Sequence, residues 1–127
     1  MTKMIMSVDE DHMTELELKN RRRDLEYALE HLGLKYEVCE GSWMGVREQS
    51  YMINFRTEEN FERLKQSAKN CGQVSVLRIS SYGGVIESFT NPDFDDELLG
   101  KWTEVDSTGG LISYTQSFLT GKIYTTI

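Results

Sequence analysis

The order of helix-like and strand-like segments constrains this fold more than any other feature of the sequence. A helix-like segment is followed by two strand-like segments, and this order occurs twice before three short strand-like runs end the chain. Such an order is typical of an antiparallel sheet covered by helices. The sequence therefore predicts an α+β fold, a ferredoxin-like or PII-like two-layer sandwich with two main helices and a C-terminal β extension.

Both predicted helices begin at a hydroxyl residue that can cap them. Thr14, with Glu17 three residues later, matches a capping box, and Gly33 is a suitable C-terminal cap. Thr57 precedes two glutamates, which suit the positive end of a helix. This second helix is expected to end near Asn70–Gly72.

Runs of alternating or β-branched residues predict the strands. The expected strands are Leu34–Cys39, Gln49–Phe55, Gln73–Ser80, Val85–Phe89, Gly100–Val105, Leu111–Gln116 and Lys122–Ile127. The segment Gly41–Glu48 is interpreted as a loop, and Asp93–Glu97 as an acidic loop or short helix. We expect one domain over residues 1–127, with about residues 1–12 irregular and flexible.

Composition excludes several classes of protein. The 127 residues are 39% hydrophobic and 28% charged, as in globular proteins, and the net charge of -7 argues against nucleic acid as a partner. Cys39 and Cys71 form neither a disulfide framework nor a zinc motif. Without a membrane-length apolar run or a signal peptide, we expect a cytoplasmic protein with no membrane partner.

The segment Gly41–Ile53 is the first candidate for a functional site. It places Trp43 between two glycines, which permit backbone angles that other residues avoid, and Glu48 just before a predicted buried strand. An aromatic ring and a carboxylate at the end of a rigid strand often form a small-molecule site. Glu48 is either a half-buried acid with a shifted pKa or a solvated loop acid that pairs with a nearby basic residue.

Other candidates have structural alternatives. Trp43 either stacks on a flat ring or a cation, or covers a sheet edge or subunit contact. Gln73 either binds a ligand or only the preceding helix end, and Tyr82 either offers its hydroxyl or packs at a strand end. Glu87 shares a strand face with Val85, so it needs a partner or solvent there, or is an edge charge.

Six blocks of the sequence occur in a recognisable order and spacing. They are Asn20–Arg23 with Leu25 and Leu29, Gly41–Gly45, Glu48–Tyr51, Cys71–Leu77, Leu99–Val105, and Gly121–Tyr124. Together they resemble the small phage-encoded S-adenosylmethionine lyases, long described as S-adenosylmethionine hydrolases. The resemblance covers about residues 20–127, and the joint order of the blocks carries it.

The resemblance implies a compact α/β fold and a homotrimer with active sites between its subunits. It also implies cleavage of S-adenosylmethionine to 5′-methylthioadenosine and homoserine lactone, without a metal or cofactor, by attack of the substrate's own carboxylate. The expected role is to counter host restriction or another defence in the host cytoplasm.

The resemblance also assigns site residues. Glu48 corresponds to the family's essential Glu, which would orient the substrate and favour its positive charge. Trp43 would be a stacking or cation-facing wall, and it replaces the commoner Tyr. Glu87 is the nearest match to a second acid. Substrate binding is further assigned to Ser50, Gln73 and Tyr82.

Alternative functions remain open from the sequence. Some relatives act on S-adenosylmethionine joined to a nucleotide (SAM-AMP), so this conjugate is a second possible substrate. A non-catalytic protein that sequesters a nucleotide-like ligand would need the same site residues. A small protein that blocks a host enzyme through its acidic surface would not need Trp43 or Glu48.

Overall fold

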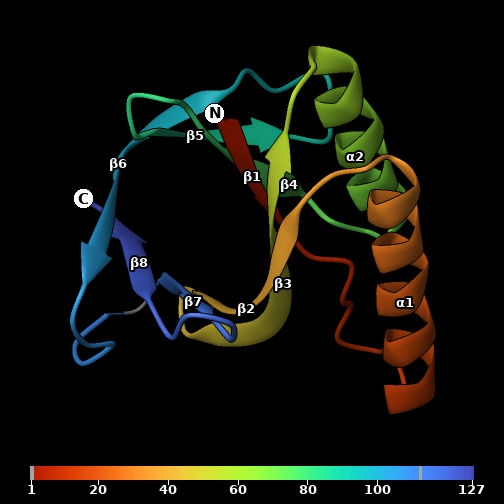
Figure 1. The fold of residues 1–127 in the computed structure, drawn as a ribbon, viewed down its shortest axis with the longest axis horizontal. Coiled ribbons are helices and arrows are strands. Elements are labelled where there is room, and N and C mark those ends of the chain that lie inside the picture. The colour runs from red at the N-terminus through yellow and green to blue at the C-terminus, as the bar shows by residue number, and fades with distance from the viewer. Residues whose placement is uncertain (1, 112) are drawn as a thin grey trace.

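The chain folds into a closed antiparallel barrel with two helices packed on one side (Figure 1). The computed structural model describes residues 2–111 and 113–127. Around the barrel the strands follow the order β1-β3-β2-β7-β8-β6-β5-β4, and β4 pairs with β1 to close the ring. The elements are β1 (Thr2–Met6), α1 (Glu15–His31), β2 (Tyr36–Trp43), β3 (Val46–Phe55), α2 (Glu58–Asn70), β4 (Ser75–Ile79), β5 (Gly84–Phe89), β6 (Glu97–Val105), β7 (Tyr114–Ser117) and β8 (Ile123–Thr126).

The predicted two-layer α+β sandwich is wrong. The N-terminal segment, expected to be irregular, forms β1, and it pairs with β3 on one side and β4 on the other. The C-terminal strands are not an extension, because β7 pairs with β2 and β6 pairs with β5. Since β7 and β6 both pair with β8, the sheet has no free edge and becomes a barrel.

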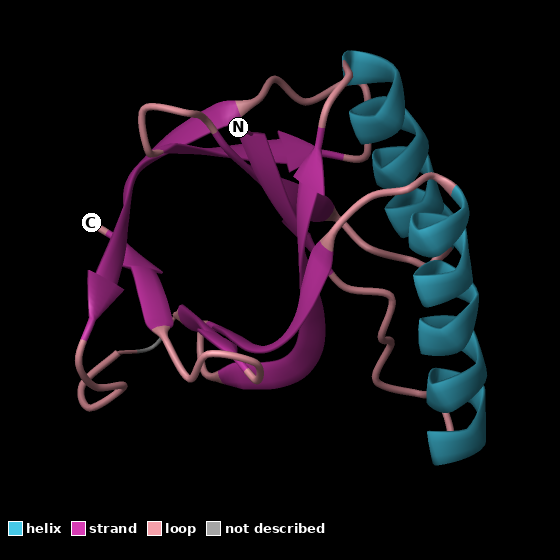
Figure 2. Cartoon of the chain, viewed as in Figure 1, coloured by secondary structure: helices cyan, strands magenta, loops and turns pink. Residues whose placement is uncertain are grey.

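Both helices cover the outer face of β1, β3 and β4 (Figures 1 and 2). Side chains alternate along a strand, so every second residue of these strands points at the helices. The resulting core contains Met4, Met6, Val8, Leu25, Leu29, Leu34, Tyr51, Ile53, Phe55, Phe61, Leu64, Ala68 and Val76. No helix in the described part of the chain is both long and apolar enough to cross a membrane.

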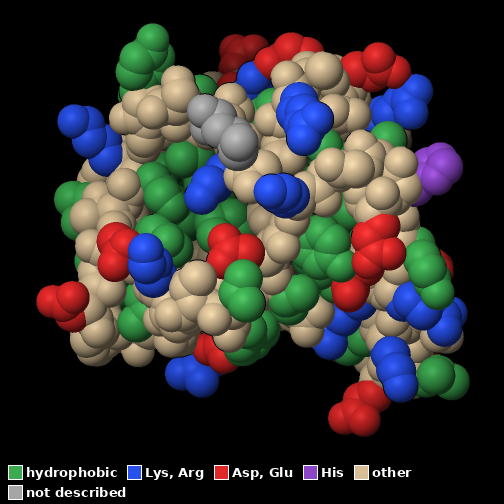
Figure 3. Space-filling model, in the orientation of Figure 1, with side chains coloured by type: hydrophobic (Ala, Val, Ile, Leu, Met, Phe, Trp, Pro, Cys, Tyr) green, Lys and Arg blue, Asp and Glu red, His purple; other side chains and the backbone are tan. Residues whose placement is uncertain are grey.

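A second, smaller core lies inside the barrel. Its buried members come from the opposite faces of the strands and are Ile5, Cys39, Met52, Ile79 and Val85. Figure 3 shows that side chains, hydrophobic ones among them, occupy the space that the ribbon leaves open in Figure 1. The barrel interior is therefore packed in part and is not an open channel.

The predicted helix signals are confirmed. The Thr14 hydroxyl accepts a hydrogen bond from the Glu17 N–H at 3.2 Å, and the Glu17 carboxylate accepts one from the Thr14 N–H, which completes the capping box. Thr57 caps α2 by accepting from the Asn60 N–H at 3.1 Å. Gly33 follows α1 with a φ of 69°, the conformation that favours glycine at a helix end.

The predicted loop over residues 41–48 is instead a tight hairpin. β2 continues to Trp43 and β3 begins at Val46, so only Met44 and Gly45 connect them. Their φ values of 52° and 84° are both positive, as in the two-residue turns that match the twist of paired strands. The hairpin holds Trp43 and Glu48 on rigid strands rather than on a loop.

Near the C-terminus the predicted strand boundaries differ from the observed ones. The strand expected at 111–116 is β7, which begins at Tyr114, and Ile112 lies outside the described residues. The acidic segment at 93–97 contains no helix, and Glu97 already belongs to β6.

The position of β1 predicts that the N-terminal segment contributes strongly to stability. Met4 is fully buried in β1, so Met4→Ala should lower the free energy of unfolding by about 2–5 kcal/mol. Met44, which is 68% exposed at the hairpin turn, is the matched control, and Met44→Ala should change the free energy by less than about 0.5 kcal/mol. Urea unfolding measures both, and equal effects would contradict a central β1.

Candidate functional site

A cavity of about 720 Å³ lies between the inner faces of adjoining strands and the segment that follows β1. Its lining comes from β5, β4, β1, β3, β2 and β7, which are consecutive neighbours in the barrel. Five acidic side chains line it, and no Lys or Arg does among the described residues. The acids are Asp9, Glu10, Asp11, Glu48 and Glu87.

Glu48 points into this cavity because of the alternation of β3. Tyr51 and Ile53 face the helices, so Glu48, Ser50 and Met52 face the barrel interior. Gly41 is directly opposite Glu48 in β2, and a Cβ on Gly41 would lie 3.1 Å from the Ser50 Oγ. Gly41 therefore provides room at this point, whereas the positive φ expected for the flanking glycines occurs only at Gly45.

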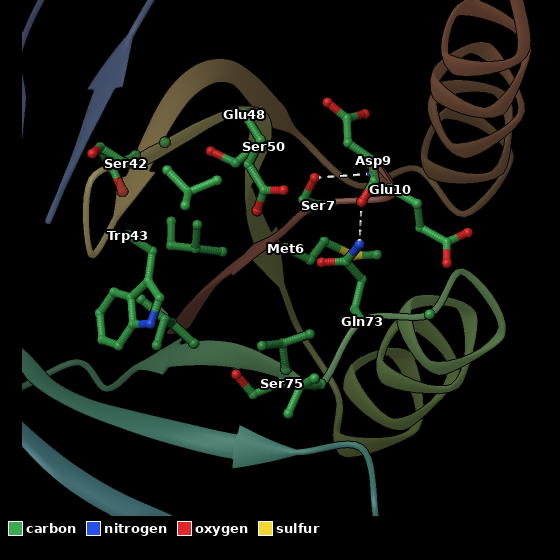
Figure 4. A pocket seen from close by; sticks show the side chains of 18 of the residues that line it. Met6, Ser7, Asp9, Glu10, Ser42, Trp43, Glu48, Ser50, Gln73 and Ser75 are labelled. Atoms are coloured by element: carbon green, nitrogen blue, oxygen red, sulfur yellow. Dashed lines mark hydrogen bonds between the residues drawn. The ribbon is translucent and has the colours of Figure 1, made fainter. Parts of the chain in front are cut away.

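The surroundings of Glu48 favour its neutral form. Burial raises the pKa of its carboxyl group above the usual value, and the charges of Asp9 and Asp11 raise it further. The nearby Ser7 hydroxyl, which donates its hydrogen bond to the Gln49 carbonyl at 2.8 Å, lowers this pKa in part. Figure 4 shows Glu48 close to Ser7, with Gln73 beyond them and Trp43 toward the opposite side of the cavity. Glu48 is thus the half-buried acid of the two predicted alternatives.

Two arginines of α1 hold the acidic segment after β1 against the barrel. Arg22 makes two hydrogen bonds to the Asp9 carboxylate, at 2.9 and 2.6 Å, and Arg21 pairs with Glu10 at 2.6 Å. In Figure 4 the Glu10 side chain points away from Glu48. The Gln49 N–H, next to Glu48, also donates to Asp9 at 3.3 Å. Ion pairs therefore offset two of the five acids and connect this segment to the start of β3.

Gln73 and Ser50 both lie at the cavity, as predicted for binding residues. The Gln73 side chain donates a hydrogen bond to the Asp9 carbonyl at 2.6 Å, so it supports the acidic segment (Figure 4). The Ser50 hydroxyl is buried and has no hydrogen-bond partner within the described part of the chain. A buried polar group without a partner is costly, and this one belongs to the wall of the cavity.

The remaining predicted residues fall into two groups. Trp43 and Glu87 line the cavity, Trp43 at 48% exposure, and the Glu87 carboxylate accepts a hydrogen bond from the Ser75 hydroxyl at 2.7 Å. Glu87 and Val85 share the inner face of β5, as the alternation predicted. Tyr82 lies in the turn between β4 and β5, is 94% exposed and does not line the cavity.

Sequence reasoning missed the segment Ser7–Asp11 and the partner of Glu87. The segment was missed because the residues before it were expected to be irregular. Two signals were present in the sequence. Alternate residues around Met4 and Met6 are of types that form strands. The acidic run can also form ion pairs with Arg21 and Arg22 of the helix that follows it. Ser75 had no distinguishing signal.

Neither cysteine belongs to a metal-ligand cluster among the described residues. No group of three or more His, Cys, Asp or Glu that could hold a metal ion occurs in residues 2–111 and 113–127. Both cysteines are free thiols, and burial inside the barrel raises the pKa of Cys39 to about 11. Cys39 is thus a protonated thiol that fills the interior.

Comparison with known proteins gives the family of the chain. A search of curated proteins found no match. The model of the S-adenosylmethionine lyase family matches residues 4–127, nearly the whole chain, including the last three residues of β1 and all of the other strands of the barrel. The chain therefore belongs to the S-adenosylmethionine lyase family and is an enzyme of that class.

Proposed function

We propose that the large cavity binds S-adenosylmethionine and cleaves it to 5′-methylthioadenosine and homoserine lactone. The observation that carries this proposal is Glu48, a half-buried carboxylate in an acidic cavity of a lyase-family chain. The substrate carries a sulfonium and an α-ammonium, two positive charges that such a cavity favours. The cavity volume of about 720 Å³ is within the range of small-molecule sites.

The proposed reaction is an intramolecular substitution. A carboxylate oxygen of the methionine part attacks the γ-carbon and forms the C–O bond of the lactone, while the bond from that carbon to sulfur breaks. The bonding electrons remain on sulfur, which becomes the neutral thioether of methylthioadenosine. No proton, metal or cofactor is required, so the enzyme accelerates the step by holding the chain folded with its reacting atoms in contact.

Glu48 and Trp43 have separate proposed roles. Glu48 binds the α-ammonium, directly or through water, and so directs the neighbouring carboxylate toward the γ-carbon. Trp43 faces the sulfonium with its ring, which attracts a cation without placing a full negative charge beside it. The sulfonium loses its charge in the reaction, so a group that stabilises this charge strongly in the bound substrate raises the barrier. An aromatic wall stabilises the charge less than a carboxylate would, and it therefore raises the barrier less.

We propose a homotrimer with active sites between its subunits, and the cavity mouth supports a subunit contact at this point. Val46 and Val74 line the cavity but are 58% and 72% exposed, and Trp43 is 48% exposed. Apolar residues that are exposed at a site rim are typical of surfaces that a partner covers. A second copy placed over them would exclude water from the reacting charges, which favours their neutralisation.

Free S-adenosylmethionine is the proposed substrate, rather than its nucleotide conjugate. The conjugate carries an additional phosphate, and phosphate sites normally contain Arg, Lys or a helix N-terminus. The described lining contains five acids and no Lys or Arg. The proposed cellular role is to remove a methyl donor on which host restriction or another defence depends, as the resemblance to phage enzymes implies.

Glu48→Gln should lower kcat/KM for S-adenosylmethionine by at least about 100-fold, because the neutral amide holds the ammonium weakly. Mass analysis of the products over time measures kcat/KM. When the reaction is run in isotopically labelled water, the lactone formed first by the wild type should carry no label. Glu59→Gln, an exposed substitution on α2, is the matched control and should retain full activity. A fully active Glu48→Gln enzyme would reject the site, and label in the first product would reject the intramolecular route.

The difference in stability between the Glu48→Gln variant and the wild type should depend on pH. Folding raises the pKa of Glu48, so the folded protein holds this proton more tightly than the unfolded chain, and the resulting stability is lost as pH rises through the raised pKa. The Tm of Glu48→Gln relative to wild type should therefore be higher at about pH 8 than at about pH 4. Calorimetry at both pH values measures this, and the reverse order would contradict the burial of Glu48.

The enzyme should discriminate against phosphate on its substrate. Under identical conditions we expect kcat/KM for S-adenosylmethionine to exceed that for the conjugate SAM-AMP by at least about 10-fold, the effect of one unfavourable charge contact. The difference should shrink as salt is added, because salt screens the acidic cavity. Faster cleavage of the conjugate would reverse the substrate assignment while leaving the lyase chemistry intact.

A further inference from the structure

A second cavity, of about 260 Å³, adjoins the first inside the barrel. The two share lining residues, among them Trp43, Leu77 and Thr115, so Trp43 lies where they meet. The proposed roles of Glu48 and Trp43 use only the larger cavity. The smaller one is below the roughly 300–1,000 Å³ of a complete small-molecule site, so it suits a part of a ligand.

The chemistry of the second cavity differs from that of the first. Its described lining contains no charged side chain. Trp102 from β6 and Tyr124 from β8 form part of its wall, with their rings nearly parallel at 11° and their centroids 5.2 Å apart. Both rings are only partly buried, although they pack on the inner core. Flat aromatic surface without charge is what a neutral heterocycle requires.

The barrel also explains two sequence blocks that the proposed function does not use. The blocks Leu99–Val105 and Gly121–Tyr124 lie on β6 and around the start of β8, which are paired strands. Glu104 lies opposite Tyr124, so Trp102 and Tyr124 are diagonal neighbours on the inner face. The two blocks thus meet in one aromatic pair at the second cavity.

We propose that the second cavity is the base-binding subsite, where the adenine ring lies against the Trp102–Tyr124 pair. The substrate would then extend across both cavities, with its sulfonium beside Trp43 and its amino-acid end near Glu48. This inference rests on the proposed function, since it assigns the other end of the same substrate. The neutral base would then contact the second cavity, and the charged parts of the substrate would contact the first.

Fluorescence tests the subsite without altering either ring of the Trp102–Tyr124 pair. The chain has two tryptophans, so in a Trp43→Phe variant Trp102 is the only one. Methylthioadenosine carries the base but neither the amino acid nor the sulfonium, and it cannot undergo the reaction. Its titration should quench the Trp102 emission to saturation. Saturable binding by calorimetry without any change in Trp102 emission would overturn the subsite.

Substitution of Tyr124 distinguishes binding of the base from binding of the amino-acid end of the substrate. Tyr124→Ala should weaken methylthioadenosine binding by about 5- to 150-fold, the range for loss of one base–aromatic stack. Binding of S-methylmethionine, a sulfonium amino acid without a base, should stay within about twofold, since Tyr124 touches only the base. Tyr27→Ala, on the exposed face of α1, is the matched control and should alter neither. Trp102→Phe, which keeps a ring, should lose less affinity than Tyr124→Ala.

The outcomes also separate this inference from the proposed function. Equal weakening of both probes by Tyr124→Ala, or of neither, would overturn the subsite even if S-adenosylmethionine is cleaved. Selective weakening of methylthioadenosine binding would support the subsite even if S-adenosylmethionine were left intact, because this measurement requires no turnover.

Discussion

The pairing of β1 with both β3 and β4 is the constraint on which the rest of the structure depends. It closes the barrel, and it places Met4 and Met6 under the helices while Ile5 faces the interior. The chain then continues directly into Ser7–Asp11, one wall of the large cavity. A single short strand therefore connects the main core, the inner core and the acidic site.

The sequence predicted the helices and the faces of the strands better than it predicted the closure of the sheet into a barrel. Capping patterns correctly predicted where both helices begin, and alternation correctly predicted that Glu87 shares a face with Val85, because these features depend on residues a few positions apart. Closure depends on contacts such as Cys39 with Ser117, far apart in the chain, which no local pattern specifies. The turn between Trp43 and Val46 was missed because a methionine rarely adopts a positive φ, as Met44 does here. The segment was therefore interpreted as a loop.

Trp43 and Glu48 were expected on a loop but lie on strands. Together with Ser50, Gln73 and Glu87 they line one cavity. Tyr82 does not, because its position beside a strand end is in fact the exposed tip of a turn. The residues that surround Glu48 from the β1–α1 segment could not be found without knowing that β1 is a central strand.

The ion pairs between α1 and the acidic segment have a consequence for the large cavity. Arg21 and Arg22 lie on a helix outside the barrel, yet they decide how much of the negative charge of Asp9 and Glu10 acts on the interior. Exchanging either arginine would change the net charge at the cavity and would also remove a contact that holds the Ser7–Asp11 wall in place. The charge and the shape of the cavity are therefore set partly by residues outside the barrel.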